Sequence, residues 1–171
     1  TQLSVFGGWV RDMPDFLVAL TKACEALPAD MALVVRPHPS CRVGQTSALH
    51  LALTNPRIRV IEGSTSAEML KNCEAVVTVN SSVGLEAFAY DKPVITLGES
   101  FYRGPGLTAQ AESAAELKGL FSQIDSLDFD AQLRRRFLTW LREAGFQRWP
   151  RHARDPAAKA LAERIDALIS A

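Results

Sequence analysis

The chain has 171 residues, and its 19 basic and 19 acidic side chains cancel to a net charge of zero. This balance excludes a large field directed at a nucleic acid or a membrane surface, so we expect no nucleic-acid partner. A hydrophobic content of 47% supplies an ample core for one domain with a helical extension.

Short apolar runs alternate with amphipathic segments over the first hundred residues. The runs at 3–6, 31–35, 57–61, 75–79 and 94–97 are typical of strands, and the spacing of apolar residues predicts helices over 13–27, 46–53, 66–72 and 83–89. This order predicts an α/β fold with a doubly wound, Rossmann-like parallel sheet. Helices expected over 113–124, 129–145 and 155–169 follow, so we divide the chain into a nucleotide-sugar-binding domain, 1–125, and a helical extension, 126–171.

The cysteines and the arginines suggest no special chemistry. Cys24, Cys41 and Cys73 are widely spaced and lack a C-x-x-C pair, which indicates ordinary thiols in a reducing compartment. No apolar run has membrane-spanning length, so we expect a cytoplasmic protein. The arginines at 134–136 and beyond alternate with apolar residues and are expected to form a solvated helix face.

A polar turn separates the central strand from the next helix. Asn80, Ser81 and Ser82 follow the run 75–79, and the helix over 83–89 carries Gly84 and Glu86. Amides at a helix start, together with serine hydroxyls, favour a phosphate, and a carboxylate one turn later suits ribose hydroxyls. The alternative is a serine N-cap followed by a surface glutamate.

A second polar feature follows the run 31–35. In Arg36-Pro37-His38-Pro39, two prolines stiffen the backbone around an imidazole, which then lies outside regular helix or sheet pairing. We interpret His38 as a donor to a phosphate or leaving group and Arg36 as an anion partner. A turn histidine without a ligand is the alternative.

A third feature is the loop after the run 94–97. Glycine and proline restrict residues 101–108, and an aromatic residue and an arginine are expected to be exposed there. Loops at the carboxyl ends of parallel strands are where open α/β sheets bind ligands. Gly7-Gly8 also follows a predicted strand, but the full dinucleotide fingerprint is absent, so we predict no NAD site.

Four motifs in this order resemble the capsule polysaccharide biosynthesis family, which contains bacterial β-Kdo transferases of group 2 capsule assembly. They are RPHP at 36–39, NSSVGLEA at 80–87, KPVITLG at 92–98 and FYRGPGLT at 101–108. The resemblance implies the C-terminal, donor-binding half of a GT-B glycosyltransferase that uses CMP-Kdo and releases CMP, with no metal and no other cofactor.

The resemblance also implies residue roles. His38 would meet the CMP phosphate as the catalytic group, Ser81 and Ser82 would cradle it, and Glu86 would hold the ribose. The donor site is expected to comprise Arg36, His38, Asn80, Ser81, Ser82, Gly84, Glu86 and Tyr102. The implied partners are a nucleotide sugar, a glycan or glycolipid acceptor, a missing N-terminal half carrying the acidic acceptor residue, and a peripheral assembly complex at the inner membrane.

Three alternatives remain open at this point. The same two turns also resemble those of CDP-glycerol-dependent polymer transferases, although Asn80 stands where these enzymes carry an acidic residue. A non-catalytic nucleotide-binding module would share the anion site without the reaction. UDP-sugar epimerases share a ribose-binding glutamate but normally have glycines in place of the double serine.

Overall fold

The computed structural model describes residues 6–36, 54–61, 63–145 and 156–170. Its described strands form two parallel sheets. In the first, β1 (Leu33–Val35) pairs with β2 (Ile58–Val60), with Leu33 opposite Ile58. In the second, β4 (Val94–Thr96) lies between β3 (Val76–Thr78) and β5 (Ala109–Gln110). The expected α/β fold with parallel strands is therefore confirmed, although the expected single sheet is divided into two.

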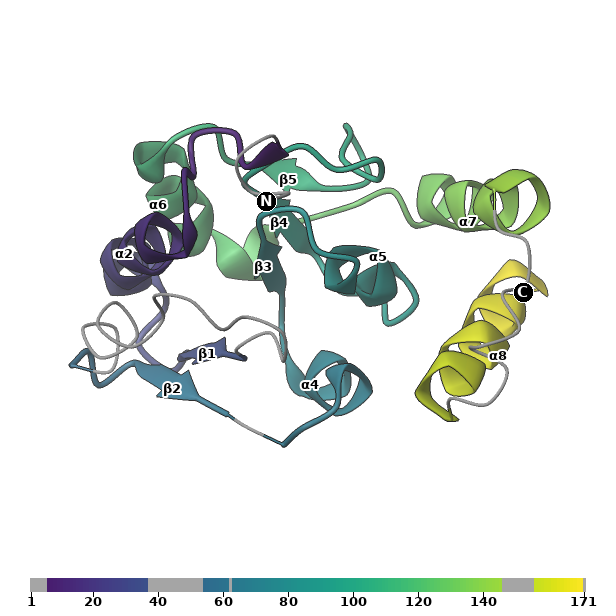
Figure 1. Cartoon of the computed structure of the whole chain (residues 1–171), viewed down its shortest axis with the longest axis horizontal. Coiled ribbons are helices and arrows are strands. Elements are labelled where there is room, and N and C mark those ends of the chain that lie inside the picture. The colour runs from purple at the N-terminus through teal and green to yellow at the C-terminus, as the bar shows by residue number, and fades with distance from the viewer. Residues whose placement is uncertain (1–5, 37–53, 62, 146–155, 171) are drawn as a thin grey trace.

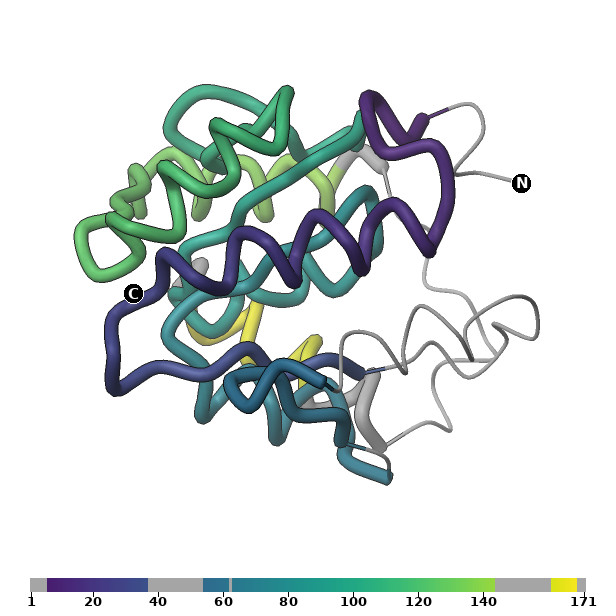
Figure 2. The backbone as a smooth tube through the Cα atoms, turned by 90° about the vertical axis from the view of Figure 1, so that its left-hand side faces the viewer, coloured from purple at the N-terminus to yellow at the C-terminus, as the bar shows by residue number. Residues whose placement is uncertain are grey.

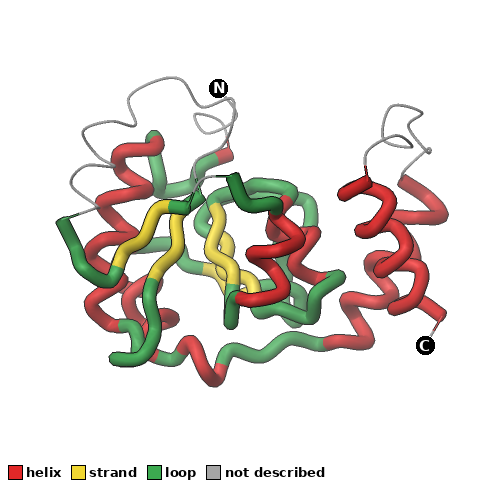
Figure 3. The backbone as a smooth tube through the Cα atoms, turned by 90° about the horizontal axis from the view of Figure 1, so that it is seen from below, coloured by secondary structure: helices red, strands yellow, loops and turns green. Residues whose placement is uncertain are grey.

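Helices cover both sides of these strands (Figures 1 and 3). On one side α2 (Met13–Ala23) and α6 (Ala114–Ser122) lie side by side (Figure 2), each followed by a short 3-10 turn, η1 (Cys24–Ala26) and η2 (Ile124–Ser126). On the other side lie α4 (Ser66–Asn72) and α5 (Val83–Phe88). Beyond them lie α7 (Ala131–Trp140), which continues into a π-helical turn (Leu141–Gly145), and α8 (Pro156–Ser170).

Most helix starts are fixed by side-chain caps. Asp12, Ser113 and Asp130 each accept a hydrogen bond from the backbone amide three residues later, which satisfies one free donor in the first turn of α2, α6 and α7. At α4, Thr65 and Glu68 form a reciprocal capping box. These caps explain why the predicted helices begin close to where the sequence places them.

The first hydrophobic core lies between the strands and the α2–α6 pair. Leu20 and Cys24 pack there with Ile95, Leu117 and Phe121, all buried. Trp9 packs against this core and its indole Nε1 donates to the Ala111 carbonyl at 2.8 Å, which joins the chain start to the segment before α6. Burial of this apolar surface is the main force that holds α2 and α6 on the sheet.

The second hydrophobic core lies on the opposite side of the strands, under α5 and α7. It contains Phe88, Val94, Tyr102, Leu107 and Leu138, and Leu161, Ile165 and Leu168 of α8 pack against it. The helices after residue 126 therefore contact the α/β part of the molecule.

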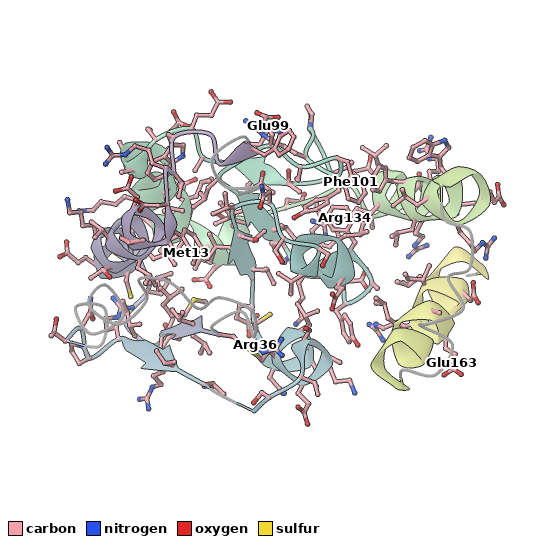
Figure 4. All side chains as sticks on the ribbon, viewed as in Figure 1. Met13, Arg36, Glu99, Phe101, Arg134 and Glu163 are labelled. Carbon is pink, nitrogen blue, oxygen red and sulfur yellow. The ribbon has the colours of Figure 1, made fainter. Side chains whose placement is uncertain are left out.

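Arg134 is buried in this second core, with 2% of its surface exposed. Its guanidinium donates to the carbonyls of Leu107 and Lys92 and lies over the rings of Phe88 and Phe129 (Figure 4). The expectation of a solvated face is wrong for Arg134, because backbone carbonyls and aromatic faces replace its water; it holds for Arg135 and Arg136, which are exposed.

The remaining differences from the predicted elements are local. Phe6 has helical backbone, so the first predicted strand is wrong at that residue, and residues 3–5 lie outside the described part. The helix predicted over 46–53 also lies outside it. Strand β5 was not predicted. Of the cysteines, Cys24 and Cys73 are free thiols, as expected; Cys24 is buried and Cys73 half-buried, and Cys41 lies outside the described residues.

Among the described residues, the helices are all too short or too polar to cross a bilayer.

Candidate functional site

Arg36 lies directly after β1, at the carboxyl end of that strand. Its Nη1 donates to Oγ of Ser66 at 3.0 Å, and Ser66 is the first residue of α4 (Figure 4). Because Thr65 and Glu68 already cap α4, the Ser66 hydroxyl is available to accept from the guanidinium. The exposed Arg36 therefore has a defined anchor and a charge that an anion can approach.

Glu86 lies on α5, one turn from the start of the helix, and is half-buried. Burial raises the pKa of its carboxyl above the ordinary value, and the positive charge of Arg36 lowers it in part. These two side chains come from different strand-helix units, Arg36 from the end of β1 and Glu86 from the helix after β3.

The turn between β3 and α5 is fixed through the backbone of Ser81. Its amide donates to Thr78 Oγ1 at 3.1 Å, and its carbonyl accepts from the Gly84 amide at 3.1 Å. The Ser81 hydroxyl accepts from the Val83 amide at 3.4 Å, whereas Ser82 makes no side-chain capping bond. Both serines are exposed, so their hydroxyls can reach a ligand.

Tyr102 is placed differently from the expectation. Its side chain is fully buried, at 0% exposure, and its hydroxyl donates to the Ser81 carbonyl. A side chain without solvent access cannot contact a ligand in an open cleft, so the expected direct contact by Tyr102 is corrected to support of the serine turn. Phe101, beside it, is the exposed aromatic of this loop, at 62%.

Gly84 is also buried, and its lack of a side chain serves Tyr102. A Cβ at this position would lie 2.5 Å from the Tyr102 hydroxyl oxygen, which is closer than real Cβ contacts. Gly84 thus provides space for the phenol, and its place among the donor-binding residues stays a prediction.

The loop after β4 is held by ion pairs and by α7. Arg103 pairs with Glu99 and, at 2.6 Å, with Glu112, while 13% of its side chain is exposed. The Leu107 carbonyl accepts from the Arg134 guanidinium at 2.6 Å. The segment 98–112, which includes β5, therefore has fixed contacts at several points.

Asn80 and His38 are the remaining predicted site residues. Asn80 is half-buried beside the serine turn. His38 lies outside the described residues, so its distance from Ser81 stays a prediction. Ser66 and Arg103 were not predicted as parts of the site. The chain spacing gives no signal for Ser66, because its partner Arg36 lies 30 residues away.

Known proteins are similar to this chain over most of its length. Residues 1–138 match the family described as capsule polysaccharide biosynthesis protein. The chain is 33% identical over 140 residues to Protein FixF of Sinorhizobium fredii, which covers 82% of this chain and 34% of FixF. It is 37% identical over 54 residues to the Capsule polysaccharide export protein KpsS of Escherichia coli, which covers 32% of this chain and 14% of KpsS. No solved structure is significantly similar.

The chain spans about a third of FixF and a smaller share of KpsS. The family match covers the strands, the serine turn and the loop after β4, so it includes every described residue of the candidate site. The chain therefore belongs to the capsule polysaccharide biosynthesis family.

Proposed function

We propose that this chain is the donor-binding part of a GT-B type glycosyltransferase that transfers Kdo from CMP-Kdo to a growing capsule or lipopolysaccharide glycan. The observation that carries the proposal is the placement of the exposed Arg36 guanidinium, bonded to Ser66 after β1, and of the half-buried Glu86 carboxyl on α5, after β3. A nucleoside monophosphate offers both complementary groups, because its phosphate suits a guanidinium and its ribose hydroxyls suit a carboxylate.

The serine turn adds neutral donors to this pair. Ser81 and Ser82 are exposed on a turn whose backbone is fixed at Thr78 and Gly84. Fixed donors stabilise charge as it develops on a leaving group without first having to reorganise. We assign the serine hydroxyls and Arg36 to the phosphate, Glu86 to the ribose, and His38 to the leaving phosphate oxygen.

In the proposed reaction, the bond between the anomeric carbon of Kdo and the CMP phosphate oxygen breaks, and CMP leaves with the electron pair. The acceptor hydroxyl oxygen forms the new glycosidic bond and gives its proton to a base. We place that base in an N-terminal half of the enzyme. Membership of the capsule polysaccharide biosynthesis family supports the class of product.

Calorimetric titration of CMP tests the donor site. Arg36→Ala should weaken CMP binding about tenfold or more, because a charge-assisted hydrogen bond contributes about 1.5–3 kcal/mol. Glu86→Gln should weaken CMP about tenfold but leave inorganic phosphate binding unchanged. Arg135→Ala, an exposed arginine on α7, is the matched control and should bind like the unaltered chain.

Unchanged CMP affinity in both site variants would contradict the assignment. Release of CMP from CMP-Kdo in the presence of an acceptor glycan, measured on the full-length protein, then tests the transfer itself. Tighter binding of CDP than of CMP would instead favour the CDP-glycerol-dependent reaction.

A second candidate is a non-catalytic nucleotide-binding module of capsule assembly. The name of the Escherichia coli relative favours it, since that protein is described as an export protein. This candidate predicts CMP binding with no CMP release from CMP-Kdo, whereas the transferase predicts both.

A further inference from the structure

We propose that Tyr102 is a positioning residue for the donor site: it holds the Ser81–Ser82 turn in its binding geometry through the Ser81 carbonyl, while Thr78 holds the Ser81 amide. This inference rests on the proposed function, because the ligand of the turn is the phosphate of a nucleotide. Tyr102 itself lies outside contact with that ligand, since its side chain is fully buried.

The tyrosine joins two strand ends that are distant along the chain. It belongs to the loop after β4, and its hydroxyl donates to the carbonyl of Ser81, in the turn after β3. Its ring is fixed by edge-to-face contacts with Phe88, at 5.8 Å between centroids, and with Phe101, at 5.4 Å. The phenol is therefore held rigidly in one orientation.

The backbone of Ser81 is held on both sides. Its carbonyl accepts from Tyr102 and from the Gly84 amide, and its amide donates to Thr78 Oγ1 at 3.1 Å. With the peptide groups of Ser81 engaged in the interior, the hydroxyls of Ser81 and Ser82 are left on the exposed side of the turn. The orientation of the turn that carries both hydroxyls thus depends on these two contacts.

Gly84 and Arg134 keep the tyrosine in place. Any Cβ at Gly84 would occupy the position of the phenol, so the glycine reserves that space. Arg134 donates to the Leu107 carbonyl, five residues after Tyr102, and so fixes the same loop to α7. Burial also raises the pKa of Tyr102 to about 12, so its hydroxyl remains a protonated donor at physiological pH.

The test compares two ligands that differ only in the phosphate. Tyr102→Phe keeps the ring and its aromatic contacts but removes the donor to Ser81. It should weaken CMP binding about tenfold and change cytidine binding less than about twofold, because only the phosphate meets the serine turn. Tyr90→Phe, which removes a hydroxyl from another mostly buried tyrosine, is the matched control and should change neither affinity.

Thr78→Val is a second variant that acts on the same turn and preserves side-chain shape. It should show the same selective loss of CMP binding, which keeps the test decisive if Tyr102→Phe folds poorly. Equal losses for CMP and cytidine, or none, would overturn the positioning role. If the unaltered chain fails to bind CMP, the proposed function falls with the inference, whereas binding by the unaltered chain with normal selectivity in both variants removes the inference alone.

Discussion

Glu86 has a carboxyl that is easier to protonate in the folded chain than in the unfolded one. Burial raises its pKa above 4.5, the ordinary value, and Arg36 offsets this effect in part. Between those two pKa values the folded state binds more protons than the unfolded state, so stability falls as pH rises through this window. The ionised carboxyl of Glu86 thus carries a cost in stability at neutral pH.

Glu86→Gln should therefore be more stable than the unaltered chain at about pH 7, and the difference should vanish at about pH 4, below both pKa values. Urea denaturation at both pH values measures it. Glu68→Gln is the control with the opposite sign, because hydrogen bonds from Thr65 lower the pKa of Glu68 and its ionised form stabilises α4. If the stability difference between Glu86→Gln and the unaltered chain did not depend on pH, this would contradict a raised pKa of the Glu86 carboxyl.

For single residues, the sequence predicts the exposed polar side chains better than it predicts the buried ones. Ser81, Ser82 and Arg36 follow apolar runs, so their positions at strand ends could be predicted from chain order. The burial of Tyr102 and Arg134 could not, because both depend on contacts with residues far along the chain: Ser81 for the first, Lys92 and Leu107 for the second.

Helix α5 packs closely against Tyr102 because Gly84 has no side chain. Gly84 lies in its first turn, against the Tyr102 ring. A glycine inside a helix normally costs about 1 kcal/mol relative to alanine, so its presence here reflects packing rather than helix propensity.

Gly84→Ala should lower the free energy of unfolding by about 1–3 kcal/mol, because the added methyl overlaps the phenol. Gly119→Ala in α6 is the matched control, since nothing lies within 4 Å of the position that its Cβ would take, and it should raise stability by about 1 kcal/mol. Thermal unfolding of the two variants compares them directly. Equal effects of the two changes would show that Tyr102 does not fill this space.

The elements were largely predictable, and the reasons are local. The α4 helix begins after a capping residue and repeats apolar residues at helical spacing, and β4 is an uninterrupted apolar run. Strand β5 was missed because Ala109–Gln110 has no apolar pattern and exists only through its pairing with β4. Division of the strands into two sheets likewise depends on tertiary pairing, which the spacing of apolar residues along the chain does not indicate.

On the scale of the whole molecule, Arg134 links the C-terminal helices to the α/β part. Its guanidinium is bonded to carbonyls in the turn after α5 and in the loop after β4. Burial lowers its pKa to about 10, so it is still charged at neutral pH. The domain division at residue 125 stays a prediction, but the contacts across it are buried and specific.

Arg134→Met should lower the free energy of unfolding by about 3 kcal/mol, since the Leu107 and Lys92 carbonyls lose their donor in a buried site. Arg135→Met, at an exposed neighbour, should change it by less than about 0.5 kcal/mol. Chemical denaturation with both variants gives the comparison. A loss in Arg134→Met no larger than in the control would mean that water can replace the guanidinium.

Strand β4 supplies neighbouring side chains to opposite layers, with Val94 in the core under α5 and α7 and Ile95 in the core under α2 and α6. Substitutions in one core should therefore disturb the other core little, provided that the backbone conformation of β4 does not change. Because both cores depend on β4, it is the segment that should tolerate the fewest changes of shape.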